Sequence, residues 1–239
     1  MPDMTNFDGN VQAADLDKLL VTQDIALGVG RPHRPALVGA RTKRLFDLVV
    51  GSLLVLFFLP FMLAIALLTR LDGGPAIFRH RRIGADGVPF PCLKFRSMVV
   101  DAEARLNELL ARDPLARAEW ERCQKLADDP RVTVLGNFLR QTSLDELPQL
   151  FNVLRGEMSL VGPRPITEAE TRRYGAAIAE YYACRPGLTG LWQVSGRSDV
   201  DYVRRVRLDA EYARNWSLGQ DIRILLRTIH VIVTKNGAY

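Results

Sequence analysis

The sequence predicts a monotopic membrane protein of the α+β class, mainly helical, with a proline-broken re-entrant helix and a cytoplasmic catalytic domain. Residues 48–68 form an apolar run of 21 residues without a charge, and Pro60 interrupts it. Basic residues flank this run on both sides, and short β-like runs and helical stretches follow it. We therefore divide the chain into a disordered tail (residues 1–40), a membrane anchor (41–71) and a catalytic domain (72–239).

The composition is that of an ordinary globular protein. The chain has 239 residues, of which 48% are hydrophobic and 25% charged, and it is long enough to bury a core. Its 3 cysteines form no C-x-x-C pair, so the sequence predicts neither a disulfide scaffold nor a structural zinc site and favours a reducing compartment. The net charge of +5 predicts an anionic partner: a phosphate-bearing substrate, an acidic lipid surface or nucleic acid.

The predicted tail is polar, contains glycine and proline, and shows no sustained periodicity. We expect it to be disordered, apart from a short helix at residues 13–20. It lacks the basic and apolar regions of a secretory signal, so we expect the protein to stay on the cytoplasmic side of the membrane.

The apolar run is long enough to reach across the hydrocarbon core of a bilayer, at ~1.5 Å per residue against ~30 Å. A buried core helix, the alternative, is normally shorter and carries a polar stripe. Pro60 lacks an N–H group, so we expect a kink there, which leaves each arm too short to span alone. Lys and Arg on both flanks do not give the one-sided bias of a single crossing. These features favour a segment that enters one leaflet and returns, and a kinked span remains the alternative.

The segment after the anchor is predicted to contain both strands and helices. Residues 75–82 and 88–95 suit a hairpin around a glycine-bearing turn, and residues 99–127 suit a helix that Pro114 divides. A C-terminal amphipathic helix is predicted from apolar residues at helical spacing, which are Ile222, Leu225, Leu226, Ile229, Ile232 and Val233. This stripe faces either the protein core or the membrane surface.

The adjacent carboxylates Asp145 and Glu146 are the leading catalytic candidates. A structural alternative exists, because Ser143 and Glu146 match a capping box ahead of an apolar helical stripe. Pro148 suits a helix that begins near residue 147 or 148. In either case the acids lie at a helix N-terminus, which favours the ionised carboxylate of a nucleophile or metal ligand over the raised pKa of a general acid.

Cations near this pair would suit phosphoryl chemistry. A carboxylate that attacks a diphosphate must overcome charge repulsion, which fixed arginine side chains and Mg²⁺ reduce. The candidates are Lys94, Arg96, Arg140 and Arg164. A glycine-rich run at residues 185–197, opened by Arg185, is either a tight loop around a packed Trp192 or a loop that faces the nucleotide or acceptor.

Four motifs together resemble those of the bacterial sugar transferases, the small monotopic polyprenyl-phosphate phosphoglycosyl transferases. They are Lys94-Phe-Arg-Ser-Met98, Thr142-Ser-Leu-Asp-Glu-Leu-Pro-Gln149, Ser159-Leu-Val-Gly-Pro-Arg-Pro165 and Arg185-Pro-Gly-Leu-Thr-Gly190, and they follow the proline-broken apolar segment. The resemblance covers roughly residues 43–239 and is greatest to the undecaprenyl-phosphate galactose phosphotransferases that start exopolysaccharide synthesis. The family often has Ser-Pro at the break, whereas this chain has Leu59-Pro60.

The resemblance implies an enzyme of the inner membrane, on its cytoplasmic face, that transfers sugar-1-phosphate from a UDP-sugar to undecaprenyl phosphate, releases UMP and requires Mg²⁺. Asp145 matches the family's nucleophile, which forms a covalent phosphosugar intermediate. Glu146 matches its partner acid at the Mg²⁺ site. Lys94, Arg140 and Arg164 match residues that line the diphosphate, and we also assign Arg96 and Arg185 to substrate binding.

Two other classes of function compete with this one. A membrane-tethered interaction subunit of a polysaccharide assembly complex, without catalysis, would keep the anchor and tolerate loss of Asp145. A nucleic-acid binder would use the positive charge, but no binding module is recognisable and the apolar run has no role in it. We therefore expect membrane lipids and no nucleic acid as partners. The identity of the sugar and the formation of a homo-oligomer stay open.

Overall fold

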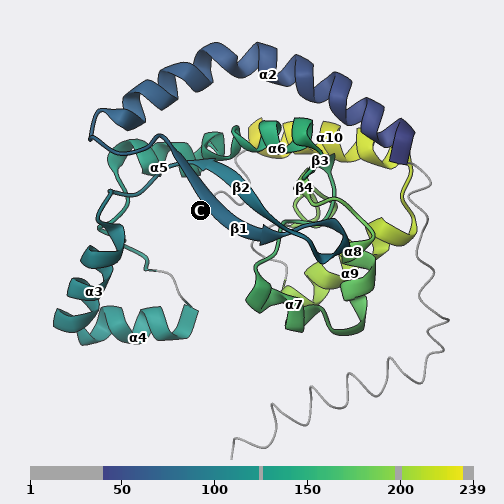
Figure 1. Ribbon diagram of the computed structural model, residues 1–239. Coiled ribbons are helices and arrows are strands. Elements are labelled where there is room, and N and C mark those ends of the chain that lie inside the picture. The colour runs from purple at the N-terminus through teal and green to yellow at the C-terminus, as the bar shows by residue number, and fades with distance from the viewer. Residues whose placement is uncertain (1–39, 124–125, 197–200, 234–239) are drawn as a thin grey trace, which may run out of the picture.

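The computed structural model describes residues 40–123, 126–196 and 201–233. The predicted tail lies outside these residues apart from Ala40, as does the short helix expected at residues 13–20. The described part is mainly helical and contains two small sheets, in agreement with the predicted class. In Figure 1 the long helix α2 (Ala40–Arg70) arches over one side of the molecule. Below it lies a layer that contains α5 (Val134–Gln141), α6 (Gln149–Arg155) and α10 (Leu218–Val233).

One stripe of α2 packs on the rest of the protein. The buried positions Asp47, Gly51, Met62, Ile65 and Thr69 recur at helical spacing, and the half-buried Leu54, Val55 and Phe58 fill the gap between them. The opposite face carries exposed leucine and phenylalanine along its length. Its length and composition would allow α2 to cross a membrane. A helix that is apolar on its exposed face as well suits contact with lipid.

The break expected at Pro60 is not confirmed, because α2 continues through it as one helix of 31 residues. Pro60 lies on the exposed face, whereas the packed stripe runs past it on the other side. A proline removes one hydrogen bond on its own side of a helix, so the helix bends away from it. The curvature of α2 over the protein body in Figure 1 fits this position.

Buried polar contacts hold the first turns of α2. Lys43 Nζ lies 2.6 Å from a carboxylate oxygen of the fully buried Asp221. Asp47, also fully buried, accepts hydrogen bonds from the Ser159 hydroxyl at 3.0 Å and from Leu160 N at 3.1 Å. Because a buried charge must be paired, these contacts fix the helix at defined positions on the domain.

The predicted hairpin is confirmed. Strands β1 (Ile77–Ile83) and β2 (Pro89–Phe95) pair antiparallel, with Ile77 opposite Phe95. The turn η1 (Ala85–Gly87) places Asp86 and Gly87 at positive φ. Phe90, Cys92 and Lys94 share one face of β2, on which Phe90 and Cys92 enter the main core and Lys94, nearer the end of the strand, is half-buried.

The remaining elements are mostly short helices. The predicted division at Pro114 is confirmed, since α3 (Ala102–Arg112) ends before it and α4 (Pro114–Cys123) begins at it. The second sheet pairs β3 (Ser159–Val161) in parallel with β4 (Gly187–Thr189). The others are α5 (Val134–Gln141), η2 (Leu144–Glu146), α6 (Gln149–Arg155), α7 (Glu168–Tyr174), η3 (Gly175–Ala177), α8 (Ile178–Tyr182), α9 (Tyr202–Arg214) and α10 (Leu218–Val233).

The C-terminal amphipathic helix is present as α10, but a different set of its residues reaches the core. Asp221 and Ile224 are buried, whereas Ile222, Leu226 and Ile229 are exposed. Of the two alternatives for the predicted stripe, the core-facing one holds for Leu225, which packs against the main core, but not for these three residues. Arg223 and Arg227 are exposed beside them, which leaves the membrane-surface alternative. The side chains of Ile232 and Val233 lie outside what the structure describes.

Candidate active site

A short turn presents the acid pair. Asp145 and Glu146 lie in the 3-10 turn η2, between the end of α5 and the start of α6. Ser143 has a left-handed backbone (φ 58) and its side chain caps nothing, so the capping-box alternative is wrong. The helix α6 begins only at Gln149, with Pro148 as its N-cap, close to the start that the proline predicted. The acids are therefore not capping residues, so their carboxylates are available to bind other groups.

Lys94 joins the two acids. Its Nζ lies 2.7 Å from Glu146 Oε1 and 3.5 Å from Asp145 Oδ2. The Lys94 side chain reaches them from β2. The next residue of the strand, Phe95, packs against α5 and α2 in a separate core cluster. Arg164 lies on the other side of Glu146, with Nη2 at 3.9 Å from Oε1. The sequence prediction that these two cations surround the acid pair is thus met by the geometry.

The two carboxyl groups differ in their ionisation. Burial raises the pKa of Asp145 above its ordinary value, and Lys94 only partly offsets this. Burial would also raise the pKa of Glu146, but Lys94, Arg164 and Arg82 outweigh it and hold that pKa below its ordinary value. The expected stabilisation of an ionised Asp145 by a helix N-terminus is not found, because α6 starts later in the chain. The charge on Asp145 depends instead on Lys94 and Arg140.

A pocket opens beside this pair. It is lined by Arg82, Cys92, Lys94, Glu146, Gln149, Arg164, Pro165, Gly187, Leu188 and Gln193. Three of these side chains are cations and one is an acid, so the lining carries an excess of positive charge. Such a pocket suits an anion with several oxygen atoms, such as a diphosphate.

Close packing of two strands places Arg164 at this pocket. The backbones of β3 and β4 approach so closely that a Cβ on Gly187 would lie 2.1 Å from Gly162 N. A side chain cannot fit there, so both positions require glycine. Gly162 directly follows β3, and Arg164 and Pro165, shortly after it, line the pocket.

A comparison with known proteins bears on this set of residues. The family model described as bacterial sugar transferase matches residues 38–235. The chain belongs to the bacterial sugar transferase family.

Several relatives of this sugar transferase carry more specific names. It is 54% identical over 197 residues to an undecaprenyl-phosphate galactose phosphotransferase of Salmonella typhimurium, across 82% of this chain and 41% of that protein. It is 49% identical over 203 residues to the exopolysaccharide production protein ExoY of Rhizobium meliloti, across 84% and 90% of the two chains. A UDP-glucose:undecaprenyl-phosphate glucose-1-phosphate transferase of Caulobacter vibrioides is 42% identical over 227 residues, across 91% and 79%. The chain therefore spans less than half of the Salmonella relative and most of the other two.

Two of the predicted substrate-binding residues of this sugar transferase are engaged elsewhere. Arg96 donates all of its guanidinium N–H groups to protein acceptors, which are Pro75 O, Met98 O, Thr69 O and both oxygens of Asp72. It therefore fastens the end of α2 and has no donor left for a substrate. Arg185 Nε donates to Gly156 O at 2.9 Å, and Arg185 does not line the pocket. The structure therefore places Arg96 and Arg185 outside the pocket lining, and their assignment to substrate binding stays a prediction.

Arg140 holds an intermediate position in the sugar transferase site. Its Nε donates to the Ser97 hydroxyl at 2.8 Å. The charge of Arg140 lowers the pKa of Asp145, but its side chain does not line the pocket. Arg82 and Gln193 line the pocket but were not among the predicted site residues. The sequence marks Arg82 only as one of the basic residues that follow the apolar run. The one available signal was strand alternation, which places Arg82 and Lys94 on half-buried positions of paired strands.

Proposed function

We propose that this bacterial sugar transferase transfers sugar-1-phosphate from a UDP-sugar to undecaprenyl phosphate and releases UMP, as the first membrane step of exopolysaccharide synthesis. The observation that carries the proposal is the acid pair joined by Lys94 at the edge of a cation-lined pocket. Undecaprenyl phosphate is proposed as the lipid acceptor because the names of the Salmonella and Caulobacter relatives include it. Those two names differ in the sugar, and the greater identity to the first favours galactose.

In the proposed reaction Asp145 is the nucleophile. One carboxylate oxygen of Asp145 forms a bond to the phosphorus that carries the sugar, and the bond from that phosphorus to the bridging oxygen breaks. The electron pair leaves with UMP. The phosphate of undecaprenyl phosphate then attacks the same phosphorus and frees Asp145. Lys94 serves by opposing the effect of burial on the pKa of Asp145 and by reducing the repulsion between carboxylate and diphosphate.

Mg²⁺ is the cofactor that we propose for this reaction. No group of three His, Cys, Asp or Glu side chains in the described parts of the chain could hold a metal ion on its own. The carboxylate oxygens of Glu146 nevertheless fit Mg²⁺, which commonly binds one or two carboxylates together with substrate phosphates. When bound, the ion would supply neutralisation of the diphosphate charge. Glu146 would hold it from the protein side.

We further propose that α2 enters one leaflet from the cytoplasmic face of the inner membrane without crossing it. Both ends of the helix are fastened to the same domain, through Lys43 and Asp47 at the start and through the contacts of Arg96 at the end. A helix that crossed the bilayer would place its ends on opposite sides. The exposed apolar face of α2, and that of α10, would contact lipid.

Labelling of lipid from a radioactive donor tests the proposal. Membranes that contain the wild-type chain should transfer label from UDP-galactose, or from another UDP-hexose tested in parallel, to the lipid fraction. The Asp145→Asn variant should lose this transfer. Asp86→Asn, a change of an exposed aspartate in the hairpin turn, serves as the matched control. Mass spectrometry of enzyme incubated with donor alone should find a hexose phosphate on Asp145.

Two outcomes would contradict the proposal in different ways. Unchanged labelling by Asp145→Asn would remove Asp145 as the nucleophile while leaving the transferase activity. An absence of labelling by the wild-type chain with every UDP-sugar would favour the tethered interaction subunit instead.

A further inference from the structure

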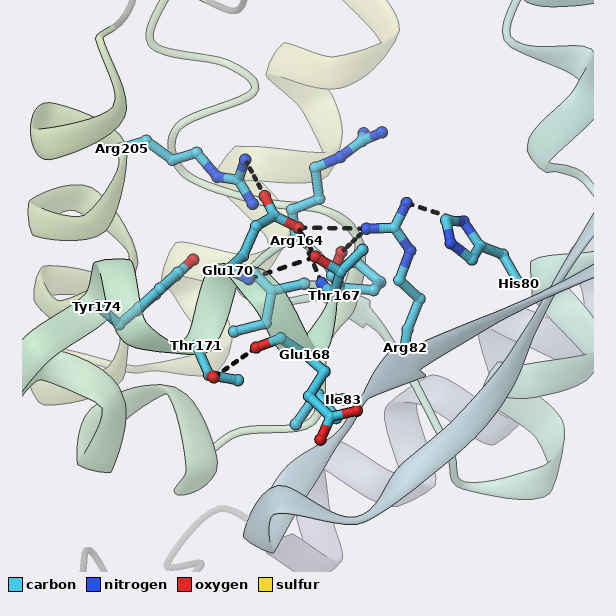
Figure 2. A network of polar contacts seen from close by, with 12 residues as sticks. His80, Arg82, Ile83, Arg164, Thr167, Glu168, Glu170, Thr171, Tyr174 and Arg205 are labelled. Carbon is cyan, nitrogen blue, oxygen red and sulfur yellow. Dashed lines mark hydrogen bonds and ion pairs between the residues drawn. The ribbon is translucent and has the colours of Figure 1, made fainter. Parts of the chain in front are cut away.

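Arg82 is the cation of the pocket to which the reaction above gives no role. It comes from the end of β1 and lines the pocket with Lys94, Arg164 and Glu146. Its side chain is 18% exposed, so most of the guanidinium is removed from water. Figure 2 shows Arg82 between Glu170 on one side and His80 on the other. A charged group that is buried to this extent must have a structural or a binding purpose.

The hydrogen-bond donors of Arg82 are only partly used. Nη1 donates to Pro165 O at 3.2 Å and to Glu170 Oε2 at 3.4 Å, and Nη2 contacts His80 Nδ1 at 3.2 Å. A guanidinium has five N–H donors. Within the described ranges the Nε–H group and one N–H of Nη2 therefore have no protein acceptor. Arg96, by contrast, gives every donor to the protein. Arg82 thus keeps binding capacity that Arg96 lacks.

The carboxylate beside Arg82 is fixed independently of any substrate. Glu170 accepts hydrogen bonds from Thr167 N at 2.8 Å and from the Thr167 hydroxyl at 3.0 Å. The bond from Thr167 N, together with the one that Glu170 N donates to Thr167 Oγ1 at 3.3 Å, forms the capping box of α7. The other carboxylate oxygen of Glu170 lies 3.6 Å from Arg205 Nη1. Because both oxygens are held in this way, Glu170 offers Arg82 a stationary partner (Figure 2).

The cations of the pocket differ in their distance from the nucleophile. Lys94 contacts both acids, and Arg164 lies near Glu146 alone. Among the charges that act most on the pKa of Asp145 are Lys94 and Arg140, whereas Glu146 is influenced by Lys94, Arg164 and Arg82. Arg82 also shares the lining of the pocket with Glu146, Lys94 and Arg164, whereas Asp145 is not part of that lining. A diphosphate whose terminal phosphorus is attacked by Asp145 would place its other phosphate toward Arg82.

We propose that Arg82 binds the nucleoside-side phosphate of the UDP-sugar, and that Glu170 is the positioning residue that holds Arg82 in place for it. The inference rests on the proposed function and adds a residue to the donor site. As the bond from the attacked phosphorus to the bridging oxygen breaks, the electron pair remains on the phosphate of UMP. The N–H groups of Arg82 stabilise this growing charge, so Arg82 acts on donor binding and on UMP departure.

Steady-state kinetics of the full-length enzyme in lipid nanodiscs test this role. Arg82→Gln should raise KM for UDP-galactose about 10-fold to 100-fold, the loss of one charge-assisted hydrogen bond, and should slow UMP release from donor alone. KM for undecaprenyl phosphate should stay within about twofold. Arg82→Lys should recover part of the loss. Arg81→Gln is the matched control, because Arg81 is the neighbouring residue of β1 and is exposed.

Glu170→Gln tests the positioning role. Glutamine can still form the capping box, so α7 should keep its start while Arg82 loses its charged partner. We expect KM for the UDP-sugar to rise less than in Arg82→Gln, with no change for the lipid. Calorimetric titration of UDP-galactose into Asp145→Asn enzyme, with and without Arg82→Gln, reports binding apart from turnover.

The inference is overturned if Arg82→Gln and Arg82→Lys match the control in donor KM, donor affinity and UMP release while wild-type enzyme is active. It is also overturned if both KM values rise together, or if the two variants lose only thermal stability. Failure of the wild-type enzyme to turn over any UDP-sugar would instead refute the proposed function on which the inference rests.

Discussion

Lys94 contacts two carboxylates that respond to it differently. Asp145 is buried among few compensating charges, so its pKa stays above the ordinary value, whereas Glu146 has three cations near it and its pKa stays below. Glu146 is therefore the more readily ionised of the two. If Asp145 is the nucleophile, the activity depends on its negative charge. Loss of Lys94 should therefore reduce both the charge on Asp145 and the activity.

The pH dependence of Lys94→Gln tests this relation. A nucleophilic carboxylate must be ionised, so kcat/KM should fall as pH decreases through the raised pKa of Asp145. Removing Lys94 removes the strongest effect that lowers this pKa, so the acid limb should move to higher pH. Arg140→Gln, whose residue acts more weakly on Asp145, should shift the limb less. An acid limb that stays in place in Lys94→Gln would contradict the assigned coupling.

The site residues divide by what a sequence can show about them. Asp145, Glu146, Lys94 and Arg164 stand in dense motifs, and the structure brings them together. Arg96 stands in the same motif as Lys94, but its role depends on where α2 ends in space, which no local pattern reveals. Arg82 carries no local distinction from the arginines around it.

At the scale of elements, strand β2 serves two sites. Lys94 reaches the acid pair, and two residues later Arg96 binds the last turn of α2 and the residues after it. The end of β2 and the residue that follows it therefore link the end of α2 to the turn η2, which carries the acid pair. Hydrophobic periodicity predicted the existence of both elements, but not this connection between them.

Substitution by lysine separates the two kinds of arginine. Arg96→Lys loses most of its hydrogen bonds and should lower the free energy of unfolding by about 2–3 kcal/mol, with little change in donor KM. Arg164→Lys should raise donor KM with a small change in stability, because Arg164 is more exposed and has one distant ion pair. Thermal unfolding in detergent and donor kinetics together measure both effects. Equal rises in donor KM in Arg96→Lys and Arg164→Lys would support a role of Arg96 in substrate binding.

The position of α5 depends on one glycine. A Cβ on Gly136 would lie 2.0 Å from Ser97 O, so the helix touches the backbone that follows β2. Gly136→Ala should displace α5 together with Arg140 and the acid turn after it. We expect lower thermal stability and loss of activity, measured by unfolding and UMP release. Gly219→Ala, which meets nothing within 4 Å, is the matched control and should keep both properties.

Element boundaries were predicted where one residue type determines them, and were missed where packing does. Pro114 and Pro148 marked helix starts closely, because the first turn of a helix accommodates proline best. Pro60 did not break α2, because the packed stripe continues on the opposite side of the helix. A core-facing residue of α10 is Ile224, which the strongest apolar stripe did not include.

At the scale of the whole molecule, the topology of α2 can be measured with single cysteines. In a background that lacks the three native cysteines, Thr42→Cys and Leu71→Cys place thiols at exposed positions near the two ends of the helix. Because both ends are fastened to one domain, both thiols should react from the cytoplasmic side and resist an impermeant reagent added outside. Reaction of one thiol from outside would establish a true span.

The packed stripe of α2 makes the anchor part of the enzyme's interior. Met62 and Ile65 share a core cluster with Phe95 and Leu139, and Phe46 and Val50 pack against the main core. Deleting the helix would therefore open two apolar cores to water and leave Asp221 without its lysine. Attempts to release a water-soluble fragment by trimming the anchor should yield aggregating protein. The distance between Asp145 and the exposed apolar face of α2 is therefore set by side-chain packing within the fold.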